Sequence, residues 1–410
     1  MPTTRHTPAL NRRQFVTTAA AAGLGLAAAR STARAAPGNK LVLGIIGSGG
    51  RGRTLMKGFQ SVPGVEFAAV CDVYEDSTAR ALKLAAPRAK VYADHRALLD
   101  RKDLDAVVIA TPDHWHYQQL ADAVAAGKDV YLEKPMSWSI EQGKKMVQLV
   151  RASKQIVQVG MQRRSSPGVI AAKQLVDSGI LGEVNYAQAQ WFWNMKPLAA
   201  NRPLAGKLDW ERFRGPSSKL ELDPPQHARF FNWRYFWDFS GGNMTDQGTH
   251  LMDVIQWFLN DGRPPRSAVC QGSVFRLQPA QTPDVFSASF EFPKFLATWT
   301  LAYTNSYQDS WRITLQGDKA TLVLDDSGYR VFPDAGRGGK PIPATQQAEA
   351  KISTEAHLQN FADCVRSRQE PNAPVEVGHH AVSGPHLANI AFHKQAKAIL
   401  NDDGLVTTAG

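Results

Sequence analysis

Lys134 is a candidate for charge and proton chemistry because of where it falls in the chain. It follows the apolar run 129–132 in the sequence EKP, between Glu133 and Pro135. A lysine at the carboxyl end of a strand, in a partly desolvated cleft, can hydrogen-bond a substrate oxygen and stabilise the negative charge that develops there. Glu133 is placed to position the ammonium group. The alternative interpretation is a surface lysine in an ordinary loop.

A second pair of candidates is Asp246 and His250, in the sequence DQGTH. Residues four apart on a helical turn project from one face, so the carboxylate can orient the imidazole or share a substrate with it. The structural alternative is a helix N-terminus capped by Thr245 or Asp246, with His250 packed in the core. The residues alone leave both interpretations open.

A His-x-His pair, His114 and His116, lies within the sequence TPDHWH. A zinc ion would need further ligands at suitable spacing, and the neighbouring sequence contains none. We therefore predict no metal at this pair.

The stretch 41–52, LVLGIIGSGGRG, begins the element that would position these side chains. Its first six residues form a nearly continuous apolar run, typical of a central parallel strand covered on both faces. Three glycines follow in GxGxxG register, which suits a tight turn, backbone approach to a pyrophosphate and close helix packing. The N-terminus of the next helix offers free N–H groups to phosphates. The candidate cofactor-binding residues in this loop are Gly47, Gly49, Gly50, Arg51 and Gly52.

Asp72 strengthens the interpretation of this loop as a dinucleotide site. It ends the next apolar strand, 65–71, and lies 20 residues after Gly52. A carboxylate there can accept hydrogen bonds from the adenosine ribose hydroxyls and would repel the 2′-phosphate of NADP. The sequence therefore favours NAD, with NADP as an alternative because Arg51 and Arg53 lie beside the loop. The structural alternative is that Asp72 merely caps a loop.

Strands and helices alternate from residue 38 to residue 160, which predicts a doubly wound parallel sheet, a Rossmann domain. The carboxyl ends of its strands share one edge, so the glycine loop, the TPDHWH segment and the EKP segment should converge on one crevice. The predicted strands are 41–46, 65–71, one near 91, 105–110, 129–132 and 156–159, and the predicted helices are 76–86, 95–100, 117–126 and 140–153.

The remainder of the chain, 161–410, predicts a second domain, an α/β arrangement on an open, mostly antiparallel sheet with one helix-covered face. We expect a surface loop at 334–348. The expected strands are 184–189, 286–292, 297–303, 311–316 and 320–324, followed by helices at 357–368 and 383–400.

Two aromatic-rich stretches lie in this part of the chain, 191–193 and 230–237, the second with Arg229 and Arg234. Flat aromatic faces suit the C–H surfaces of sugars, and arginines suit hydroxyl or carboxylate groups. Core packing or a subunit interface explains any single one of these residues equally well.

Residues 1–35 are predicted to be a twin-arginine signal peptide. Arg12 and Arg13 precede a mildly apolar run that is too short for a comfortable membrane span, and Ala33 to Ala35 supply a small-x-small cleavage site. Removing the five arginines of this segment lowers the net charge from +10 to about +5. The remaining basic residues are scattered, which argues against nucleic-acid binding.

The three cysteines, Cys71, Cys270 and Cys364, match no metal motif. Cys71 lies in a predicted core strand, so buried free thiols are favoured over a disulfide framework.

The segments GIIGSGGRG, ATPDHWHYQQLADAVAAGKDVYLEKPMSWS, VGMQRRSSPGVIAAKQLVDSGILGEV, GGNMTDQGTHLMDVIQWF and FADCVRSRQEP resemble the glucose-fructose oxidoreductase, inositol dehydrogenase and MocA (Gfo/Idh/MocA) family. The resemblance spans essentially the whole chain after the signal. It implies that Lys134 contacts the reacting hydroxyl, that His250 exchanges its proton and that Asp246 binds substrate or holds the histidine. It also implies a cis peptide bond at Pro135 and subunit contacts through the C-terminal sheet of a homo-oligomer. It places Trp115 and His116 in the nicotinamide pocket. The residues it assigns to cofactor binding outside the glycine loop are Thr111, Pro112, His114, His116, Glu133 and Lys134.

The resulting hypothesis is an NAD(P)-dependent oxidoreductase, exported to the periplasm by the Tat translocase, that moves hydride between a sugar or polyol hydroxyl and a tightly held cofactor. Free NAD is scarce outside the cytoplasm, so a second substrate would regenerate the cofactor in a ping-pong cycle. Only residues 36–39 separate the cleavage site from the first strand, so a long N-terminal arm that clamps the cofactor is not expected. The alternatives are an NAD-dependent glycoside hydrolase, acting by transient oxidation and elimination, and a non-catalytic sugar-binding protein.

Overall fold

The computed structural model describes residues 40–198, 202–215 and 229–409. The predicted signal, residues 1–35, lies outside the described residues. Within the described ranges, no helix combines the length and the apolar character needed to cross a membrane.

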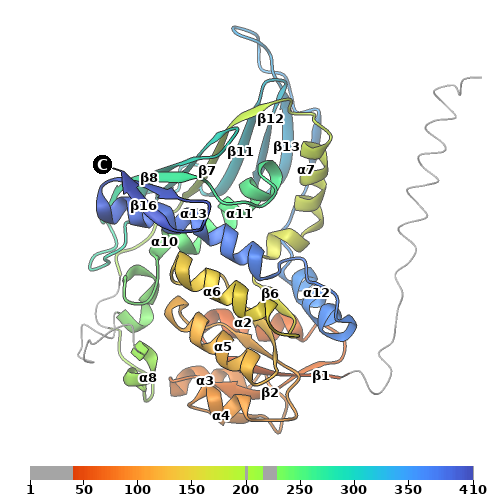
Figure 1. Ribbon diagram of the computed structural model, residues 1–410, viewed down its shortest axis with the longest axis vertical. Helices are drawn as coiled ribbons and strands as arrows, with labels where there is room; N and C mark the ends of the chain where they lie inside the picture. Colours follow the sequence, from red (N-terminus) through yellow and green to blue (C-terminus); the bar gives the residue numbers. More distant parts are fainter. Residues whose placement is uncertain (1–39, 199–201, 216–228, 410) are drawn as a thin grey trace, which may run out of the picture. The chain divides into compact units, whose positions relative to one another are not determined.

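The first half of the fold is a six-stranded parallel sheet, in the order β3-β2-β1-β4-β5-β6, as the alternation of strands and helices predicts (Figure 1). β1 is central and buried because its residues are apolar on both faces. The strands are β1 (Leu41–Ile46), β2 (Val65–Cys71), β3 (Lys90–Tyr92), β4 (Ala106–Ile109), β5 (Asp129–Leu132) and β6 (Val157–Val159).

The helices of this half connect successive strands and pack on the sheet. Ser139 caps the last of them, its Oγ accepting a hydrogen bond from the Gln142 N–H. The predicted helix 76–86 ends earlier, at Leu82, where turn hydrogen bonds from the Leu84 and Ala85 N–H groups to the Ala81 and Leu82 carbonyls replace the helical pattern. The helices are α2 (Gly50–Phe59), α3 (Glu75–Leu82), α4 (His95–Leu99), α5 (His116–Ala125) and α6 (Ile140–Arg151).

The second half is a ten-stranded sheet that is antiparallel except where β7 and β10 run parallel. Five of its strands match the predicted ones within two or three residues, whereas β8 and β13–β16 were not predicted. The strands are β7 (Val184–Phe192), β8 (Ser267–Ser273), β9 (Val285–Glu291), β10 (Leu296–Ala302), β11 (Ser310–Gly317), β12 (Ala320–Asp325), β13 (Gly328–Pro333), β14 (Gln346–Ala348), β15 (Lys397–Leu400) and β16 (Val406–Ala409).

Helices cover one face of this sheet, as predicted, and bury Trp299, Phe290 and Leu251 in one core. The prediction of a helix over 383–400 is wrong at both ends. α13 begins after Pro374 and ends at Lys394, because the next residue, Gln395, has a left-handed φ of 50°. Residues 397–400 then pair with β8 as β15. The covering helices are α7 (Pro167–Asp177), α10 (Gly242–Asp246), α11 (Gly248–Leu259) and α13 (Val375–Lys394).

The chain returns to the parallel sheet near its end. α12 (Thr354–Ser367) packs against α2, and Phe361 lies edge-on to Phe59 and Tyr131 at centroid distances of 6.1 and 5.7 Å. Leu358 and Phe361 are completely buried in the core of the parallel sheet. The first half therefore takes part of its core from a helix that lies late in the chain, between β14 and α13 of the second half.

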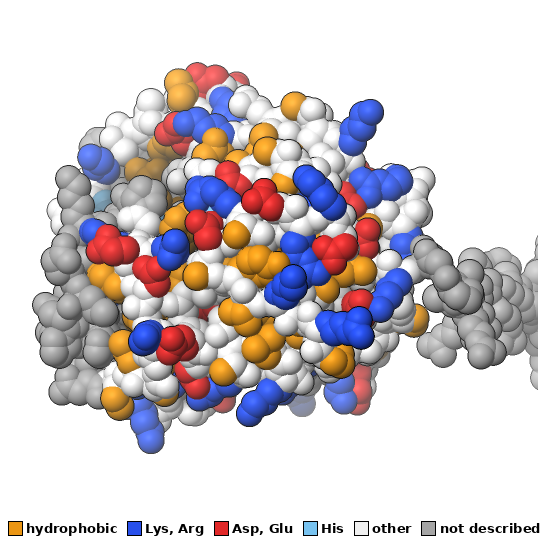
Figure 2. All heavy atoms as spheres, turned by 90° about the horizontal axis from the view of Figure 1, so that it is seen from below, with side chains coloured by type: hydrophobic (Ala, Val, Ile, Leu, Met, Phe, Trp, Pro, Cys, Tyr) orange, Lys and Arg blue, Asp and Glu red, His pale blue; other side chains and the backbone are white. Residues whose placement is uncertain are grey.

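The charged surface is mixed where Figure 2 displays it. Lysine and arginine side chains alternate with aspartate and glutamate side chains on that face. A surface of interspersed sign is typical of a protein with no polyanionic partner on that side.

Candidate active site

The glycine loop has the shape that a pyrophosphate needs. Gly47 has a φ of +85°, and a Cβ there would lie 2.6 Å from the Thr111 nitrogen, so only glycine fits this turn. Gly52 allows the start of α2 to pack on the turn, since its Cβ would lie 2.1 Å from the Gly47 carbonyl oxygen. Gly49 and Gly50 face open space, because a Cβ at either position would have nothing within 4 Å. The backbone is therefore open to a ligand at the N-terminus of α2.

Asp72 supports this loop directly. Its Oδ2 accepts hydrogen bonds from the Ser48 backbone N–H at 2.6 Å and from the Ser48 hydroxyl at 3.0 Å, and its Oδ1 accepts one from the Tyr74 N–H at 3.0 Å. Burial raises the pKa of the Asp72 carboxyl, while these hydrogen bonds oppose the shift. The side chain thus shapes the loop as well as lining the cavity beside it.

A cavity of about 420 Å³ runs from the glycine loop past Asp72. Its size and its mixed polar and apolar lining fit part of a dinucleotide. Most of the predicted cofactor residues line it, whereas Gly52, His114, His116, Glu133 and Lys134 do not; Glu133 and Lys134 line a second cavity instead. The predicted residues in its wall are Gly47, Gly49, Gly50, Arg51, Asp72, Thr111, Pro112 and Trp115.

His114 and His116 lie behind the wall. His116 is fully buried and its ring nitrogens bond the carbonyl oxygens of Pro135 and Thr111, at 2.8 and 3.0 Å. The Nε2 of His114 bonds the Phe213 carbonyl at 2.9 Å. Burial lowers the pKa of both histidines, to about 4 for His114. In the described residues these two side chains connect loops around the cavity, and no cluster of three metal-ligating side chains is found there.

Arg51 and Glu133 connect the glycine loop to the EKP segment. The Nε of Arg51 donates to Glu133 Oε1 at 2.7 Å, and Glu133 is only 3% exposed. Glu133 Oε2 accepts from the Lys134 backbone N–H at 3.2 Å. This pair holds the phosphate-binding loop and the catalytic candidate Lys134 in one rigid unit.

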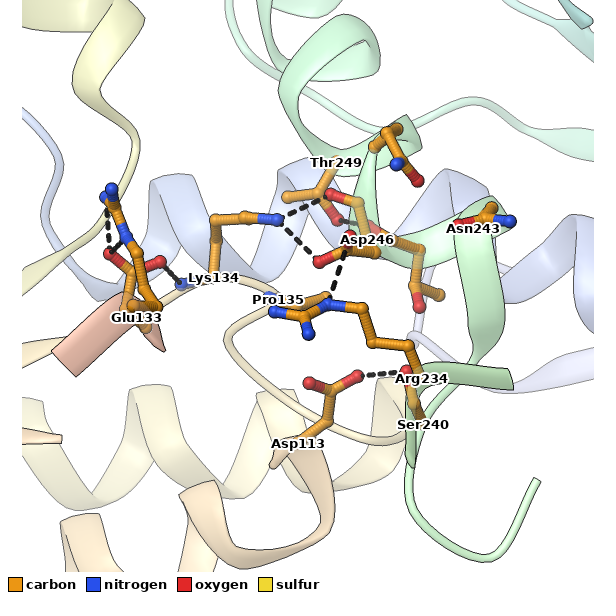
Figure 3. A network of polar contacts seen from close by, with 12 residues as sticks. Asp113, Glu133, Lys134, Pro135, Arg234, Ser240, Asn243, Asp246 and Thr249 are labelled. Carbon is orange, nitrogen blue, oxygen red and sulfur yellow. Dashed lines mark hydrogen bonds and ion pairs between the residues drawn. The ribbon is translucent and has the colours of Figure 1, made fainter. Parts of the chain in front are cut away.

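Lys134 reaches the second half of the fold (Figure 3). Its Nζ donates to Asp246 Oδ1 at 2.7 Å and to the Asp246 carbonyl oxygen at 2.9 Å. The Nε of Arg234 lies 3.3 Å from Asp246 Oδ2, so one carboxylate is shared by two cations. Burial would raise the pKa of Asp246, but the charges and hydrogen bonds of Lys134 and Arg234 outweigh burial and lower it to about 2. The peptide bond between Lys134 and Pro135 is cis, as the resemblance implies.

Asp113 lies below this group in Figure 3 and is 2% exposed. Its Oδ2 accepts a hydrogen bond from the Ser240 hydroxyl at 2.7 Å. Burial raises the pKa of Asp113 to about 7 despite this bond, and the neighbouring Asp246 adds to the shift. Asp113 was not among the predicted site residues, although it lies inside the TPDHWH segment.

His250 lies in the first turn of α11 and is 8% exposed. Its Nδ1 is buried and has no hydrogen-bond partner among the described residues. Burial, followed by the charges of Lys134 and Arg163, lowers the pKa of His250 well below its usual value, so the ring is neutral. The helix breaks at Gln247, between α10 and α11, and the Asp246 carboxylate faces Lys134 and Arg234.

A second cavity of about 290 Å³ adjoins the first, and both are lined by Arg51, Thr111, Trp233 and Arg234. Lys134 and Asp246 lie in its wall. The aromatic stretches contribute Trp193, Trp233 and Tyr235, while Phe236 packs in a separate core with Trp210 and Phe239. Sequence reasoning missed three further residues of the wall: Asn243, Gln247 and Tyr303.

These three residues form a chain of hydrogen bonds. Gln247 Nε2 donates to the Tyr303 hydroxyl at 2.7 Å, and that hydroxyl donates to Asn243 Oδ1 at 3.3 Å. Asn243 and Gln247 lie within four residues of Asp246, so their proximity in sequence is a signal that could have found them. Tyr303 follows β10 and has no such signal.

Comparison with known proteins agrees with this architecture. The model of the oxidoreductase family with NAD-binding Rossmann fold matches residues 41–161, and that of the GFO/IDH/MocA C-terminal domain matches residues 169–323. The inositol 2-dehydrogenase/D-chiro-inositol 3-dehydrogenase of Lacticaseibacillus casei is 33% identical over 89% of this chain and 96% of its own length. The chain belongs to the Gfo/Idh/MocA oxidoreductase family. It is thus an oxidoreductase-family member with an NAD-binding Rossmann domain, and the glycine loop fits that cofactor.

Other members of the Gfo/Idh/MocA family match in part. The inositol 2-dehydrogenase of Klebsiella pneumoniae (strain 342) is 34% identical over 35% of this chain, and the match spans 43% of that relative's length. A glycosyl hydrolase family 109 protein of Solibacter usitatus is 27% identical over half of each chain. The structure of levoglucosan dehydrogenase with NADH has a TM-score of 0.69 at 16% identity, covering 88% of this chain and 99% of that one, which shows the shared fold.

Proposed function

We propose that this protein transfers hydride between a hydroxyl-bearing carbon of a sugar or polyol and NAD. The observation that carries the proposal is the Lys134–Asp246 pair, 2.7 Å long, in the wall of a cavity that adjoins the dinucleotide cavity. A cation held at that boundary is where charge develops on the oxygen of a reacting carbinol.

The residues divide the chemical work as follows. Bound NAD supplies the hydride acceptor. Lys134 donates a hydrogen bond to the reacting oxygen, and Asp246 stays ionised and holds the ammonium group in place. His250, neutral because of its lowered pKa, accepts the hydroxyl proton when the substrate is oxidised. Arg51 and Glu133 hold the loop that presents Lys134.

The substrate class rests on the second cavity and on the relatives. Trp193, Trp233 and Tyr235 give that cavity flat apolar walls, and Asn243 and Gln247 add amide groups suited to hydroxyls. Two of the proteins compared above are named for inositol oxidation, and a structural neighbour for levoglucosan oxidation. A neutral, ring-shaped polyhydroxy compound is the substrate class that suits these features best.

We further propose that the protein is exported through the Tat translocase to the periplasm as a folded holoprotein, from the twin-arginine pattern at Arg12 and Arg13. The cofactor would then travel inside the protein. A homo-oligomer through the face of the C-terminal sheet away from its helices is also proposed, since Val269 and Leu296 on that sheet are 46% and 45% exposed.

The deciding experiment is a cofactor analysis of protein purified from the periplasm. Denaturing the protein should release a stoichiometric nicotinamide nucleotide, and adding sugars or polyols to the intact protein should give NADH absorbance at 340 nm with at least one of them. Protein in the cytoplasm only would contradict export. Bound NAD that no carbinol substrate reduces would contradict the oxidoreductase assignment.

A second candidate function is an NAD-dependent glycoside hydrolase, favoured by the match to the Solibacter family 109 protein. The same cavity would then oxidise a sugar ring carbon transiently, and re-reduction would follow loss of the aglycone. Release of p-nitrophenol from aryl glycosides without NADH accumulation would establish this function. The intact EKP segment argues for the dehydrogenase.

A further inference from the structure

The chain between β7 and α10 makes a long excursion to the parallel sheet. We call its described residues 202–215 and 229–239 the strap. In Figure 1 the first part of the strap, α8 (Trp210–Arg214), lies beside α3, away from the ten-stranded sheet. Its later turn, Trp233–Tyr235, returns to α10. Two sets of hydrogen bonds attach the strap to the parallel-sheet half of the fold.

The first attachment of the strap follows directly after Asp72. The Glu75 N–H donates to the Lys207 carbonyl at 3.0 Å, and the Asp209 N–H donates to the Val73 carbonyl at 2.9 Å. The Ala205 N–H donates to the Tyr74 hydroxyl at 2.7 Å. These bonds attach the strap as a short antiparallel pairing at the end of β2, where the adenosine ribose of a dinucleotide is expected.

The second attachment is at the end of β4. The Phe213 carbonyl accepts hydrogen bonds from Trp115 Nε1 and His114 Nε2, both at 2.9 Å. Gly215 lies so close that a Cβ there would be 2.7 Å from the Trp115 ring. The buried His114 and the half-buried Trp115 of the TPDHWH segment thus act as anchors for the strap.

Between these two attachments the strap forms a wall of the dinucleotide cavity, opposite the glycine loop. Phe213, Phe230 and Phe231 give it an aromatic surface, and Arg202 and Arg212 give it positive charge. Phe230 packs edge-on against Tyr74 at a centroid distance of 5.1 Å, which joins the wall to the first attachment. Aromatic rings with guanidinium groups suit an adenine base and a diphosphate.

We propose that the strap is the outer wall of the adenosine side of the cofactor site, and that a bound dinucleotide dissociates only when the strap separates from residues 73–75 and Trp115. The protein would then retain its cofactor between turnovers. This inference uses the NAD-binding domain and does not depend on which substrate is oxidised.

A reversible cross-link tests the proposal. A Cβ placed on Gly206 lies 3.2 Å from the Glu75 Cβ, close to the 3.5–4.5 Å typical of disulfides, so Glu75→Cys/Gly206→Cys should form a bond across the first attachment. The variant is loaded with NADH, oxidised, and mixed with excess NAD, and the loss of bound-NADH fluorescence gives the release rate. We expect release at least tenfold slower in the oxidised than in the dithiothreitol-reduced protein. The parent protein, with its three native cysteines, should show no such difference.

A second variant weakens the attachments instead. Tyr74→Phe/Trp115→Phe removes the hydrogen bond to Ala205 and one of the two hydrogen bonds to the Phe213 carbonyl, and should speed NADH release several-fold. Tyr186→Phe is the matched control, because it removes a tyrosine hydroxyl bond on the remote sheet. Equal release rates in the oxidised and reduced cross-linked protein, with no acceleration in Tyr74→Phe/Trp115→Phe, would overturn the proposal. Both readouts follow nucleotide release, so they remain valid if the proposed reaction is wrong.

Discussion

Lys134 Nζ and Asp246 Oδ1, from residues 112 apart in the sequence, are 2.7 Å apart where the two halves of the fold meet. Both side chains are nearly buried, with exposed fractions of 14% and 12%. Removing one partner of a buried ion pair lowers the free energy of unfolding strongly, because the other partner is left as an uncompensated buried charge. The pair therefore has both a chemical and a structural consequence.

Lys134→Met should lower kcat by at least about 100-fold, because the developing charge on the reacting oxygen loses its donor. The same change should destabilise the protein by about 3 kcal/mol in urea unfolding, because Asp246 keeps a buried charge with only Arg234 as partner. Lys145→Met is the matched control, since Lys145 pairs with Glu141 on the exposed surface of α6, and its loss should leave the unfolding free energy nearly unchanged. A Lys134→Met enzyme with parental kcat would exclude the catalytic assignment.

The lowered pKa of His250 predicts the pH profile of oxidation. The imidazole must be neutral to accept a proton, so kcat should stay level as the pH falls through 6.5 and decline only well below it. His250→Gln should reduce kcat by about 100-fold or more and remove that acidic limb. His393→Gln, at an exposed position on α13, serves as control. If kcat of His250→Gln still declines at low pH, the group that titrates is not His250.

Asp113 should make stability depend on pH. Its folded pKa of about 7 lies above the ordinary value of 3.8, so the folded state holds a proton that the unfolded state releases between these values. Its contribution is most favourable below pH 4 and is lost as the pH rises through 7, by about 4 kcal/mol. Asp113→Asn cannot ionise and should not show this decrease. The unfolding free energy of the variant minus that of the parent should therefore rise between pH 5 and pH 8 in urea titrations. The surface substitution Asp177→Asn should show no such trend.

Two glycines of the same loop should behave differently. Gly47→Ala should destabilise the protein by at least about 2 kcal/mol, because its φ is +85° and its Cβ would collide with the backbone of residues 110 and 111. Gly49→Ala meets no atom within 4 Å, so thermal unfolding of the ligand-free protein should stay unchanged while the Kd for NADH rises. Scanning calorimetry measures the thermal unfolding of both variants, and titration calorimetry measures their Kd for NADH. Unchanged NADH affinity in Gly49→Ala would argue against pyrophosphate binding at this residue.

Much of this site could be predicted because it lies at strand ends. The carboxyl ends of β1, β2, β4 and β5 share an edge of the parallel sheet, so Gly47, Asp72, Thr111 and Lys134 had to lie near one another. The roles of His114 and His116 could not be predicted in this way. Local sequence places them near the crevice, but it does not say that their rings turn away from it to hold other loops.

The rest of the site depends on contacts between distant segments. Tyr303 completes the second cavity after the pairing of β10 with β7 and β9. Arg234, although noted beside the aromatic stretch, reaches Asp246 from a single 3-10 turn, Trp233–Tyr235, whose position the local sequence does not give. The end of α13 could not be predicted either, because 397–400 forms a strand through its pairing with β8 and β16. Such positions are decided by tertiary partners that no local pattern records.

The position of α12 has a consequence for how the protein is made. Leu358 and Phe361 pack into the hydrophobic core between α2 and the parallel sheet, so this core is complete only when residues near the end of the chain are in place. On the ribosome, the dinucleotide domain emerges first and yet waits for almost the whole polypeptide before its core is complete. We expect cofactor capture to follow the end of synthesis, with chaperones shielding the open face of α2 until then.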